Sequence, residues 1–402
     1  MQNEKKILIV SHAMEIGGAE RALIGLLNSL DTDKYDVDLF LYRHEGELMK
    51  FIPEKINLLK SNKSYAQMAV PIMSAVKSGK LGVAYGRYIA KRKAARYVSD
   101  HFPNTDNQVE LTYSHKYTVK YMPMISYKEY DLAISFLTPH YYAAEKVRAK
   151  KKIAWIHTDY SFINIDIYTE LEMWSRYEYI ASISENVTEA FLKKFPSLED
   201  RIIQIENIIS PKLVRAQAEE FSAEKEMPNS DFTRLLSIGR FANAKNFDNI
   251  PDICRRLIDK GIKIKWYIIG YGGDENKIRD KIAEYHMEDN VIILGKKENP
   301  YPYIKECDIY VQPSRYEGKA VTVREAQILC KPVIITNFPT AKSQVEDGFD
   351  GVIVPLDNEN CASGIAKIIK DTGLLNKLVE NCKNTDYGNE GEAEKLYRLM
   401  EE

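Results

Sequence analysis

The sequence has few cysteines, almost no net charge and no long apolar run. Its five cysteines all lie in the second half of the chain, without the close pairs that zinc sites and redox motifs need. Free thiols in a reducing cytoplasm are therefore expected. The formal net charge of −2 at pH 7 provides no overall positive field that would attract a nucleic acid, so no nucleic acid partner is expected.

No uninterrupted apolar stretch approaches the roughly 20 residues that a bilayer span requires. The first apolar run, residues 7–10, is too short for the core of a signal peptide. We therefore expect a cytoplasmic protein that is soluble or peripheral on the inner face of the membrane. The 402 residues, 45% of them hydrophobic and 28% charged, exceed what one hydrophobic core usually organises, which predicts two or three domains.

Short apolar runs separated by helix-length segments predict two α/β domains with parallel sheets. The first domain, residues 1–208, begins with a strand that leads into Gly17-Gly18 and then a helix. Ser184 is placed to cap a later helix of this domain. The predicted strands of the first domain are residues 7–10, 35–42, 132–136, 153–156 and 179–183.

The second domain, residues 209–381, follows a stretch at 210–231 whose composition predicts a helix and a linker. Its predicted strands are residues 234–238, 265–269, 291–294, 309–312, 332–336 and 351–354. Residues 382–402 contain a predicted helix with no strand after it. We expect this helix to pack back on the first domain.

Residues 61–130 do not fit the alternation of strands and helices and are predicted to be a basic, tyrosine-rich insertion in the first domain. From Lys77 to Arg96, lysines and arginines interleave with apolar and tyrosine side chains. This pattern is typical of a basic amphipathic helix that contacts an anionic membrane surface. A solvated helix face without any partner is the alternative interpretation.

Two acids, Glu317 and Glu325, follow the predicted strand at 309–312 and lie eight positions apart. Ligands of open α/β sheets bind at the carboxyl ends of the strands, and the free N–H groups of a helix N-terminus suit a phosphate. If a helix begins just after Gly318, then Glu317 lies in the turn and Glu325 lies two turns along the helix. Glycine at position 318 would let a ligand approach closely. Incidental acids on a capped surface helix are the alternative.

Arg240 and Lys245 lie five positions apart, just after the predicted strand at 234–238. A leaving nucleoside diphosphate develops negative charge as its glycosidic bond breaks. A guanidinium and an ammonium at this position would stabilise that charge without a metal ion. Taken alone, the two residues could equally be surface charges.

These features together resemble the GT-B glycosyltransferases of family 4, a retaining group also described as glycosyl transferases group 1. The resemblance covers nearly the whole chain except residues 61–130. It rests on Gly17-Gly18-Ala19-Glu20-Arg21, on Gly239-Arg240 with Lys245, on Ile268-Ile269-Gly270-Tyr271-Gly272, on the Glu317/Glu325 pair and on Gly348-Phe349-Asp350-Gly351-Val352. It implies two Rossmann-like domains facing across a cleft, with the acceptor in the first and the donor in the second.

The resemblance also implies roles for individual residues. Glu325 would accept hydrogen bonds from the ribose hydroxyls, and Glu317 would contact hydroxyls of the transferred sugar. Arg240 and Lys245 would neutralise the diphosphate, and His157 would bind a sugar hydroxyl near the reacting carbon. The remaining predicted donor-binding residues act mainly through their backbone or contact the nucleobase: Gly17, Gly18, Gly270, Lys296, Gly318, Lys319, Ala320, Val321 and Thr322.

Other chemistries fit the sequence less well. Gly17-Gly18 lacks the Gly-x-Gly-x-x-Gly spacing of a dinucleotide site. Asp31-Thr32-Asp33 and Asp36-Val37-Asp38 precede or enter a strand and are predicted to be structural, so no metal site and no cofactor are expected. A retaining hydrolase would need two carboxylates that flank the anomeric carbon, and no nucleophile is evident.

The sequence thus predicts a retaining, metal-independent glycosyltransferase. It would move a hexose or N-acetylhexosamine from a nucleoside diphosphate sugar, UDP-linked, to a glycan or lipid-linked acceptor in cell-surface polysaccharide or capsule synthesis. A nucleotide-sugar epimerase or a phosphorylase on the same fold is one alternative, since a fold does not determine a reaction. A non-catalytic nucleotide-sugar-binding partner of a glycosyltransferase complex is another.

Overall fold

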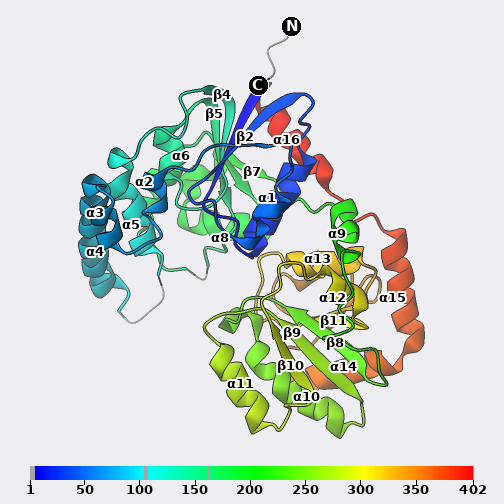
Figure 1. The fold of residues 1–402 in the computed structure, drawn as a ribbon. Helices are drawn as coiled ribbons and strands as arrows, with labels where there is room; N and C mark the ends of the chain where they lie inside the picture. Colours follow the sequence, from blue (N-terminus) through cyan, green and yellow to red (C-terminus); the bar gives the residue numbers. More distant parts are fainter. Residues whose placement is uncertain (1–4, 104–106, 162, 402) are drawn as a thin grey trace. The chain divides into compact units, whose positions relative to one another are not determined.

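The computed structural model describes residues 5–103, 107–161 and 163–401, which form two compact units (Figure 1). Unit 1 comprises Met1–Ile208 and Asn389–Glu402, and unit 2 comprises Ile209–Gly388. The segment that returns to unit 1 therefore begins at Asn389 and not at the predicted residue 382. The difference arises because α15 (Thr372–Asn384) continues past that position and buries Cys382 in unit 2.

Unit 1 contains a parallel sheet of seven strands in the order β3-β2-β1-β4-β5-β6-β7. The four central apolar residues of β1, residues 7–10, are at most 1% exposed, which explains their continuous apolar run. The strands are β1 (Lys5–Ser11), β2 (Tyr35–Leu41), β3 (Asn57–Leu58), β4 (Glu129–Ser135), β5 (Arg148–Ile156), β6 (Tyr179–Ser182) and β7 (Ile202–Gln204). Two of them, β3 and β7, were not expected from the sequence, because they are only two and three residues long.

Helices connect these parallel strands. Ser184 caps α8 as predicted, because its side chain accepts the N–H of Val187 at 3.3 Å. The C-terminal helix packs on unit 1, where Tyr397 stacks on Tyr35 with ring centroids 4.2 Å apart. The helices of this unit outside the insertion are α1 (Gly18–Ser29), α6 (Tyr141–Lys146), α7 (Ile167–Trp174), α8 (Glu185–Lys194) and α16 (Ala393–Leu399).

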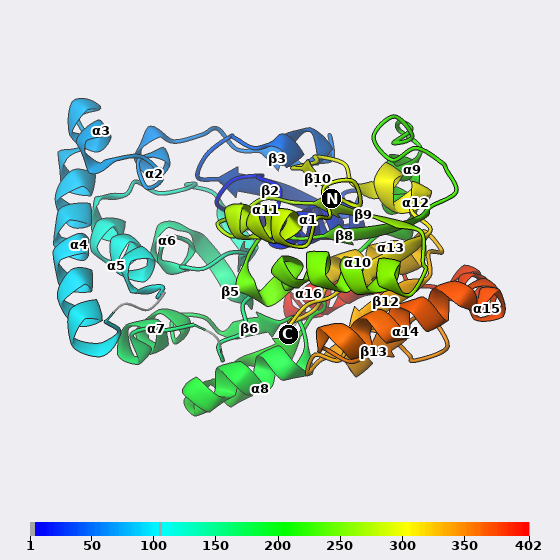
Figure 2. The ribbon, with the colours of Figure 1, turned by 90° about the horizontal axis from the view of Figure 1, so that it is seen from below.

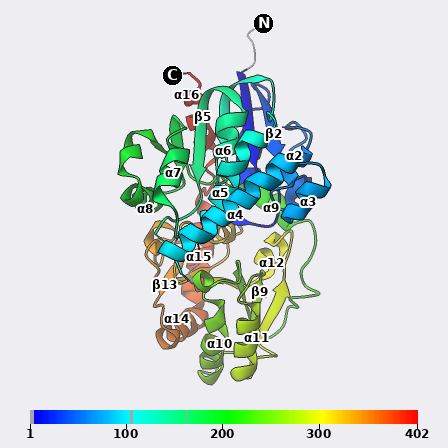
Figure 3. The ribbon, with the colours of Figure 1, turned by 90° about the vertical axis from the view of Figure 1, so that its left-hand side faces the viewer.

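The predicted insertion between β3 and β4 is helical. Figure 3 shows α4, its longest helix, with α3 and α5 beside it. A buried Glu170 on α7 anchors the insertion: its carboxylate accepts hydrogen bonds from Thr112 of α5 at 2.6 Å, from Tyr160 at 3.1 Å and from Trp174 at 3.2 Å. The helices of the insertion are α2 (Lys63–Ala66), α3 (Ile72–Lys77), α4 (Leu81–His101) and α5 (Val109–Thr118).

Unit 2 contains a parallel sheet of six strands in the order β10-β9-β8-β11-β12-β13, and every strand expected there is present. The strands are β8 (Thr233–Ile238), β9 (Ile264–Ile269), β10 (Val291–Gly295), β11 (Ile309–Gln312), β12 (Val333–Thr336) and β13 (Val352–Val354). The helices are α9 (Pro211–Ala218), α10 (Ile250–Asp259), α11 (Glu275–Glu284), α12 (Tyr301–Glu306), α13 (Val321–Ile328), α14 (Asn358–Lys370) and α15.

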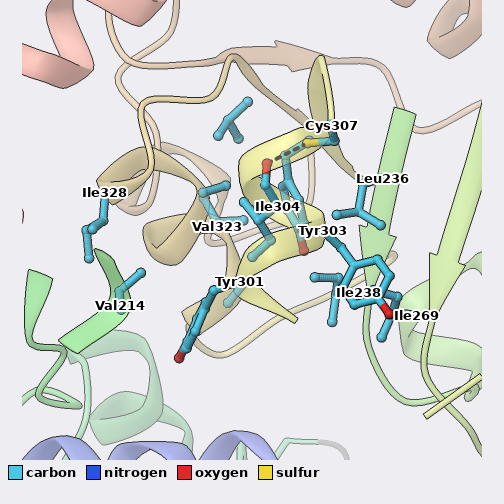
Figure 4. Packing of buried hydrophobic residues seen from close by; sticks show 14 of the residues in the cluster. Val214, Leu236, Ile238, Ile269, Tyr301, Tyr303, Ile304, Cys307, Val323 and Ile328 are labelled. Carbon is cyan, nitrogen blue, oxygen red and sulfur yellow. Dashed lines mark hydrogen bonds between the residues drawn. The ribbon is translucent and has the colours of Figure 1, made fainter. Parts of the chain in front are cut away.

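Two hydrophobic clusters fill unit 2, one on each face of its sheet. One cluster joins the sheet to α10, α11 and α14, and α10 and α14 lie side by side (Figure 2). The other joins it to α9, α12 and α13, where Val323 and Ile304 pack near Leu236 of β8 (Figure 4). The expected free thiols belong to these clusters; Cys254, Cys307, Cys361 and Cys382 are buried and Cys330 is partly exposed. No helix in the described parts of the chain is long and apolar enough to cross a bilayer.

Candidate active site

The chain order of the unit 2 sheet reverses between β8 and β11, which pair side by side. Ligands of such sheets bind beyond the carboxyl ends of the strands at this switch point. The loop after β8 carries Gly239, Arg240 and Lys245, and the loop after β11 carries Glu317. The topology therefore brings two segments that lie about seventy residues apart in sequence to one edge of the sheet.

Lys245 and Glu317 form an ion pair at this edge. The Lys245 ammonium lies 2.5 Å from Glu317 Oε1, and the two side chains are 21% and 9% exposed. Glycine at position 239 leaves room for the lysine, because a Cβ there would lie 3.1 Å from Lys245 Cε. The carboxylate and the ammonium are thus held in place before any ligand binds.

A chain of hydrogen bonds extends from Glu317 into the sheet. Ser314 Oγ donates to Glu317 Oε1 at 2.6 Å, and Gln312 Nε2 donates to Ser314 Oγ at 2.9 Å. Tyr310 in turn donates to Gln312 Oε1 at 2.6 Å. These three residues were not predicted as site residues. The sequence feature that could have identified them is the polar pair of Gln312 and Ser314 at the end of a buried strand.

A second set of contacts joins the two loops. Asn246 has φ 61° and donates from Nδ2 to the carbonyl of Pro313 at 2.9 Å. Arg315 pairs with Asp248 at 3.0 Å, and Lys277 lies 2.7 Å from the same carboxylate. Burial raises the pKa of Asp248, but the hydrogen bonds from Arg315 and Lys277 outweigh it and leave that pKa lowered.

Glu325 lies on α13 and is 1% exposed. Its Oε1 accepts a hydrogen bond of 2.7 Å from the hydroxyl of Tyr301, a residue that sequence reasoning did not identify (Figure 4 shows Tyr301). The helix begins at Val321, later than the predicted start just after Gly318. The N–H of Ala320 donates to Gln344 Oε1 at 2.9 Å, so this predicted phosphate or sugar contact is already engaged within the protein.

The other predicted donor-binding residues of unit 2 lie near the same edge. Gly270 follows β9, and a Cβ there would lie 1.9 Å from the carbonyl oxygen of Gly239, so only glycine fits. Lys296 follows β10 and lies 4.9 Å from the centre of the Tyr271 ring. Arg240 is exposed just after β8. Residues in the β11–α13 connection and the first turn of α13 are partly exposed: Gly318, Lys319, Val321 and Thr322.

Three predicted site residues belong to unit 1. Gly17 precedes α1, and a Cβ there would lie 2.1 Å from Glu20 Oε2, whereas Gly18 has open space beside it. His157 directly follows β5, and burial lowers its pKa to about 3 despite a hydrogen bond with the backbone of Phe136. The imidazole is therefore neutral and a poor proton acceptor at physiological pH.

The aspartates that were predicted to be structural lie within unit 1 and have basic partners. Asp31 pairs with Lys34 at 2.9 Å, and Asp38 pairs with Lys128 at 3.0 Å. Within residues 5–103, 107–161 and 163–401, no three His, Cys, Asp or Glu side chains are grouped so that they could hold a metal ion.

The part of the chain that carries this site is similar to known glycosyltransferases. Residues 218–385 match the family model of the glycosyl transferases group 1. An amylovoran biosynthesis glycosyltransferase of Erwinia amylovora is 26% identical over 161 residues, 39% of this chain and 45% of that protein. The chain thus spans less than half of this relative. An uncharacterized glycosyltransferase of Haemophilus influenzae is 23% identical over 380 residues, 92% of this chain and 93% of that protein.

Solved structures confirm the predicted fold class. The Anabaena protein HepE in complex with UDP and glucose has a TM-score of 0.70 at 16% identity, and the match covers 99% of both chains. Two doubly wound parallel domains of the GT-B type are therefore present. Residues 218–385 of this chain are thus similar to the glycosyl transferases group 1.

Proposed function

We propose that the chain is a retaining glycosyltransferase that acts in the synthesis of a cell-surface polysaccharide such as a capsule. It transfers a hexose or N-acetylhexosamine from a UDP-linked donor to a glycan or a lipid-linked acceptor. The observation that carries the proposal is the Lys245–Glu317 pair at the switch point of unit 2. The name of the Erwinia relative and the UDP and glucose bound to HepE support the polysaccharide and the donor.

Different residues of unit 2 bind different parts of the donor. Glu325, buried on α13, accepts the ribose hydroxyls, and Glu317 accepts hydroxyls of the transferred sugar. Lys245 and Arg240 neutralise the diphosphate as the glycosidic bond breaks. The free N–H groups in the first turn of α13 supply further hydrogen bonds to phosphate or sugar oxygens.

The reaction proceeds on one face of the sugar. The bond between the anomeric carbon and the phosphate oxygen breaks, and the acceptor oxygen bonds to the same face while its proton passes to the leaving phosphate. The two cations balance the charge of that phosphate, so the step requires no metal ion. His157 is neutral and donates or accepts a hydrogen bond with a sugar hydroxyl, since its lowered pKa makes it a poor base.

The insertion in unit 1 offers a surface for a peripheral membrane contact at the inner face of the membrane. Five apolar or tyrosine side chains on α3 and α4 are 41–64% exposed: Met73, Val76, Leu81, Tyr85 and Tyr88. The exposed cations beside them on these helices are Lys77, Lys91, Arg92, Lys93 and Arg96. Arg87 is not one of them, because it is partly buried and donates to the carbonyls of Gln67 and Val70. Such a surface suits anionic lipids and a lipid-linked acceptor.

Nucleotide release from a panel of nucleoside diphosphate sugars, with and without EDTA, tests the reaction. We expect release that depends on an added acceptor and persists in EDTA, with the anomeric configuration retained in the product. Release only with a divalent metal would contradict the proposed charge balance. Donor conversion without an acceptor would favour the epimerase, release with inorganic phosphate the phosphorylase, and binding without turnover the non-catalytic partner.

Flotation with vesicles that contain phosphatidylglycerol tests the membrane contact. Each lysine near an anionic surface contributes about 1 kcal/mol, so Lys77→Gln/Lys91→Gln should weaken binding roughly 30-fold. Lys60→Gln/Lys193→Gln removes two exposed lysines elsewhere in unit 1 and should change binding little. Equal effects of the two double variants would show that the α3–α4 surface is not the contact.

A further inference from the structure

The segment between β8 and α10, residues 239–249, carries Lys245 and is called the Lys245 loop below. It contains two short 3₁₀ helices, Asn243–Lys245 and Phe247–Asn249. Asn246 lies between them with φ 61°, a region that residues other than glycine rarely occupy. The hydrogen bonds of such short helices join near neighbours and do not attach the loop to the sheet. The position of the Lys245 ammonium therefore depends on contacts from outside the loop.

Arg315 makes several of these contacts from the connection between β11 and α13. Its backbone N–H donates to the carbonyl of Ala244 at 2.8 Å, and its guanidinium donates to the carbonyl of Asn243 at 2.5 Å. Both carbonyls belong to the residues that directly precede Lys245. Because Arg315 lies two positions before Glu317, one residue restrains the backbone on both sides of the Lys245–Glu317 ion pair.

Asp248 holds the loop on the other side of Lys245. The Arg315 guanidinium donates to both carboxylate oxygens of Asp248, to Oδ1 at 3.0 Å and to Oδ2 at 3.1 Å. The Asp248 side chain is 8% exposed and that of Arg315 is 27% exposed, so water screens this pair less than a surface pair. Lys277 of α11 lies 2.7 Å from Oδ2 of the same carboxylate. The loop is thus attached to the β11 connection and to α11.

This arrangement requires the shape of a guanidinium as well as its charge. Nη1 of Arg315 reaches the Asn243 carbonyl and Asp248 Oδ1, and Nη2 reaches Asp248 Oδ2. An arginine offers these N–H groups in one plane, whereas the ammonium of a lysine is a single point charge. Lysine at position 315 would keep the charge opposite Asp248 but would lose the paired geometry.

We propose that Arg315 and Asp248 are positioning residues for glycosyl transfer, because their pair holds the Lys245 loop with the ammonium beside Glu317. They act through Lys245 and not by contact with the donor. A misplacement of about 1 Å in a catalytic group lowers a rate by up to roughly 100-fold, so the restraint has a measurable effect. This inference rests on the proposed function, because it concerns the charge balance of the same reaction.

The same sheet contains a matched control pair. Arg234 in β8 donates from Nε and Nη2 to the two carboxylate oxygens of Asp308, just before β11, at 3.2 and 2.9 Å. This pair joins the same two strands at their amino ends, whereas ligands bind beyond the carboxyl ends. Arg234→Lys therefore removes an equivalent paired geometry and leaves the Lys245 loop unaltered.

The kinetic test measures kcat of Arg315→Lys and Arg234→Lys, each in the unchanged protein and in Lys245→Met. Arg315→Lys should lower kcat about tenfold in the unchanged protein and less than about twofold in Lys245→Met, where the ammonium that it positions is absent. Asp248→Asn, which keeps the side-chain size, should follow the same pattern. Arg234→Lys should change kcat less than about twofold in both proteins. A general structural role would give equal factors with and without Lys245.

Hydrogen–deuterium exchange of the ligand-free protein tests the restraint without turnover. Backbone N–H groups of residues 243–249 should exchange roughly tenfold faster in Arg315→Lys and Asp248→Asn, and at an unchanged rate in Arg234→Lys. Unchanged exchange in both site variants, or equal losses of kcat with and without Lys245, would overturn the inference. Absence of acceptor-dependent nucleotide release with every donor would instead count against the proposed function, while exchange would still decide whether the pair holds the loop.

Discussion

Replacing Lys245 by methionine removes the ammonium of the candidate active site while keeping most of its apolar stem over Gly239. Loss of one preorganised group that stabilises transition-state charge typically lowers kcat by roughly 10²–10³-fold, about 2.7–4 kcal/mol. We expect Lys245→Met to lower kcat for glycosyl transfer by this amount. The measurement is steady-state nucleotide release with saturating donor and acceptor.

The coupling energy between Lys245 and Glu317 is measured by a double-mutant cycle of Lys245→Met and Glu317→Gln. The two side chains are 21% and 9% exposed, so the coupling should exceed that of exposed surface pairs, about 0–1 kcal/mol. We expect about 1–3 kcal/mol from kcat/KM. The Lys263–Asp231 pair of the same unit, 70% and 67% exposed, is the matched control. A coupling no larger than the control, or a kcat within about threefold of the unchanged protein, would refute the reasoning.

Three further predictions follow from buried polar groups. Tyr301→Phe removes the hydrogen bond to Glu325 and should weaken UDP binding about tenfold in calorimetry; an unchanged Kd would contradict the ribose role. Burial raises the pKa of Glu170, whose carboxylate costs stability as pH rises through that pKa. Glu170→Gln should therefore change the free energy of unfolding at pH 7 by less than about 1 kcal/mol in urea titrations. Glu170→Leu leaves the hydroxyls of Thr112 and Tyr160 without their acceptor and should lower the free energy of unfolding by more than about 2 kcal/mol. Burial lowers the pKa values of His115 and His140. The contribution of these neutral histidines to the stability of the folded protein is therefore complete above the ordinary histidine pKa and is lost as pH falls below it. Urea titrations from pH 7 to pH 5 should show a slope approaching 1.4 kcal/mol per pH unit for each histidine, and a flat profile would contradict their neutrality.

Much of the fold could be predicted because the long strands of both sheets are buried on both faces. Such strands leave continuous apolar runs in the sequence, as residues 7–10 and 309–311 do. The strands β3 and β7 have two and three residues and are held by pairing with β2 and β6 at the sheet edges, so they leave no such run. The predicted start of α13, just after Gly318, was wrong, because the helix begins at Val321. No side chain caps this helix, and the N–H of Ala320 instead donates to Gln344, which is a tertiary contact.

The candidate site likewise contains residues that local sequence patterns predict and residues that only tertiary contacts bring to the site. Glu317, Glu325 and Lys245 could be identified because motif spacing and strand ends are local properties of the sequence. The groups that hold them could not be identified from the sequence. Tyr301 reaches Glu325 from another helix, and the hydrogen bonds from Gln312 to Glu317 depend on the conformation of one loop. His12 and His140 of unit 1 are a further example, because they lie more than a hundred residues apart and come close only when β1 pairs with β4. Sequence motifs therefore identify the candidate donor-binding residues, whereas the long-range contacts that hold such residues become visible only in the folded chain.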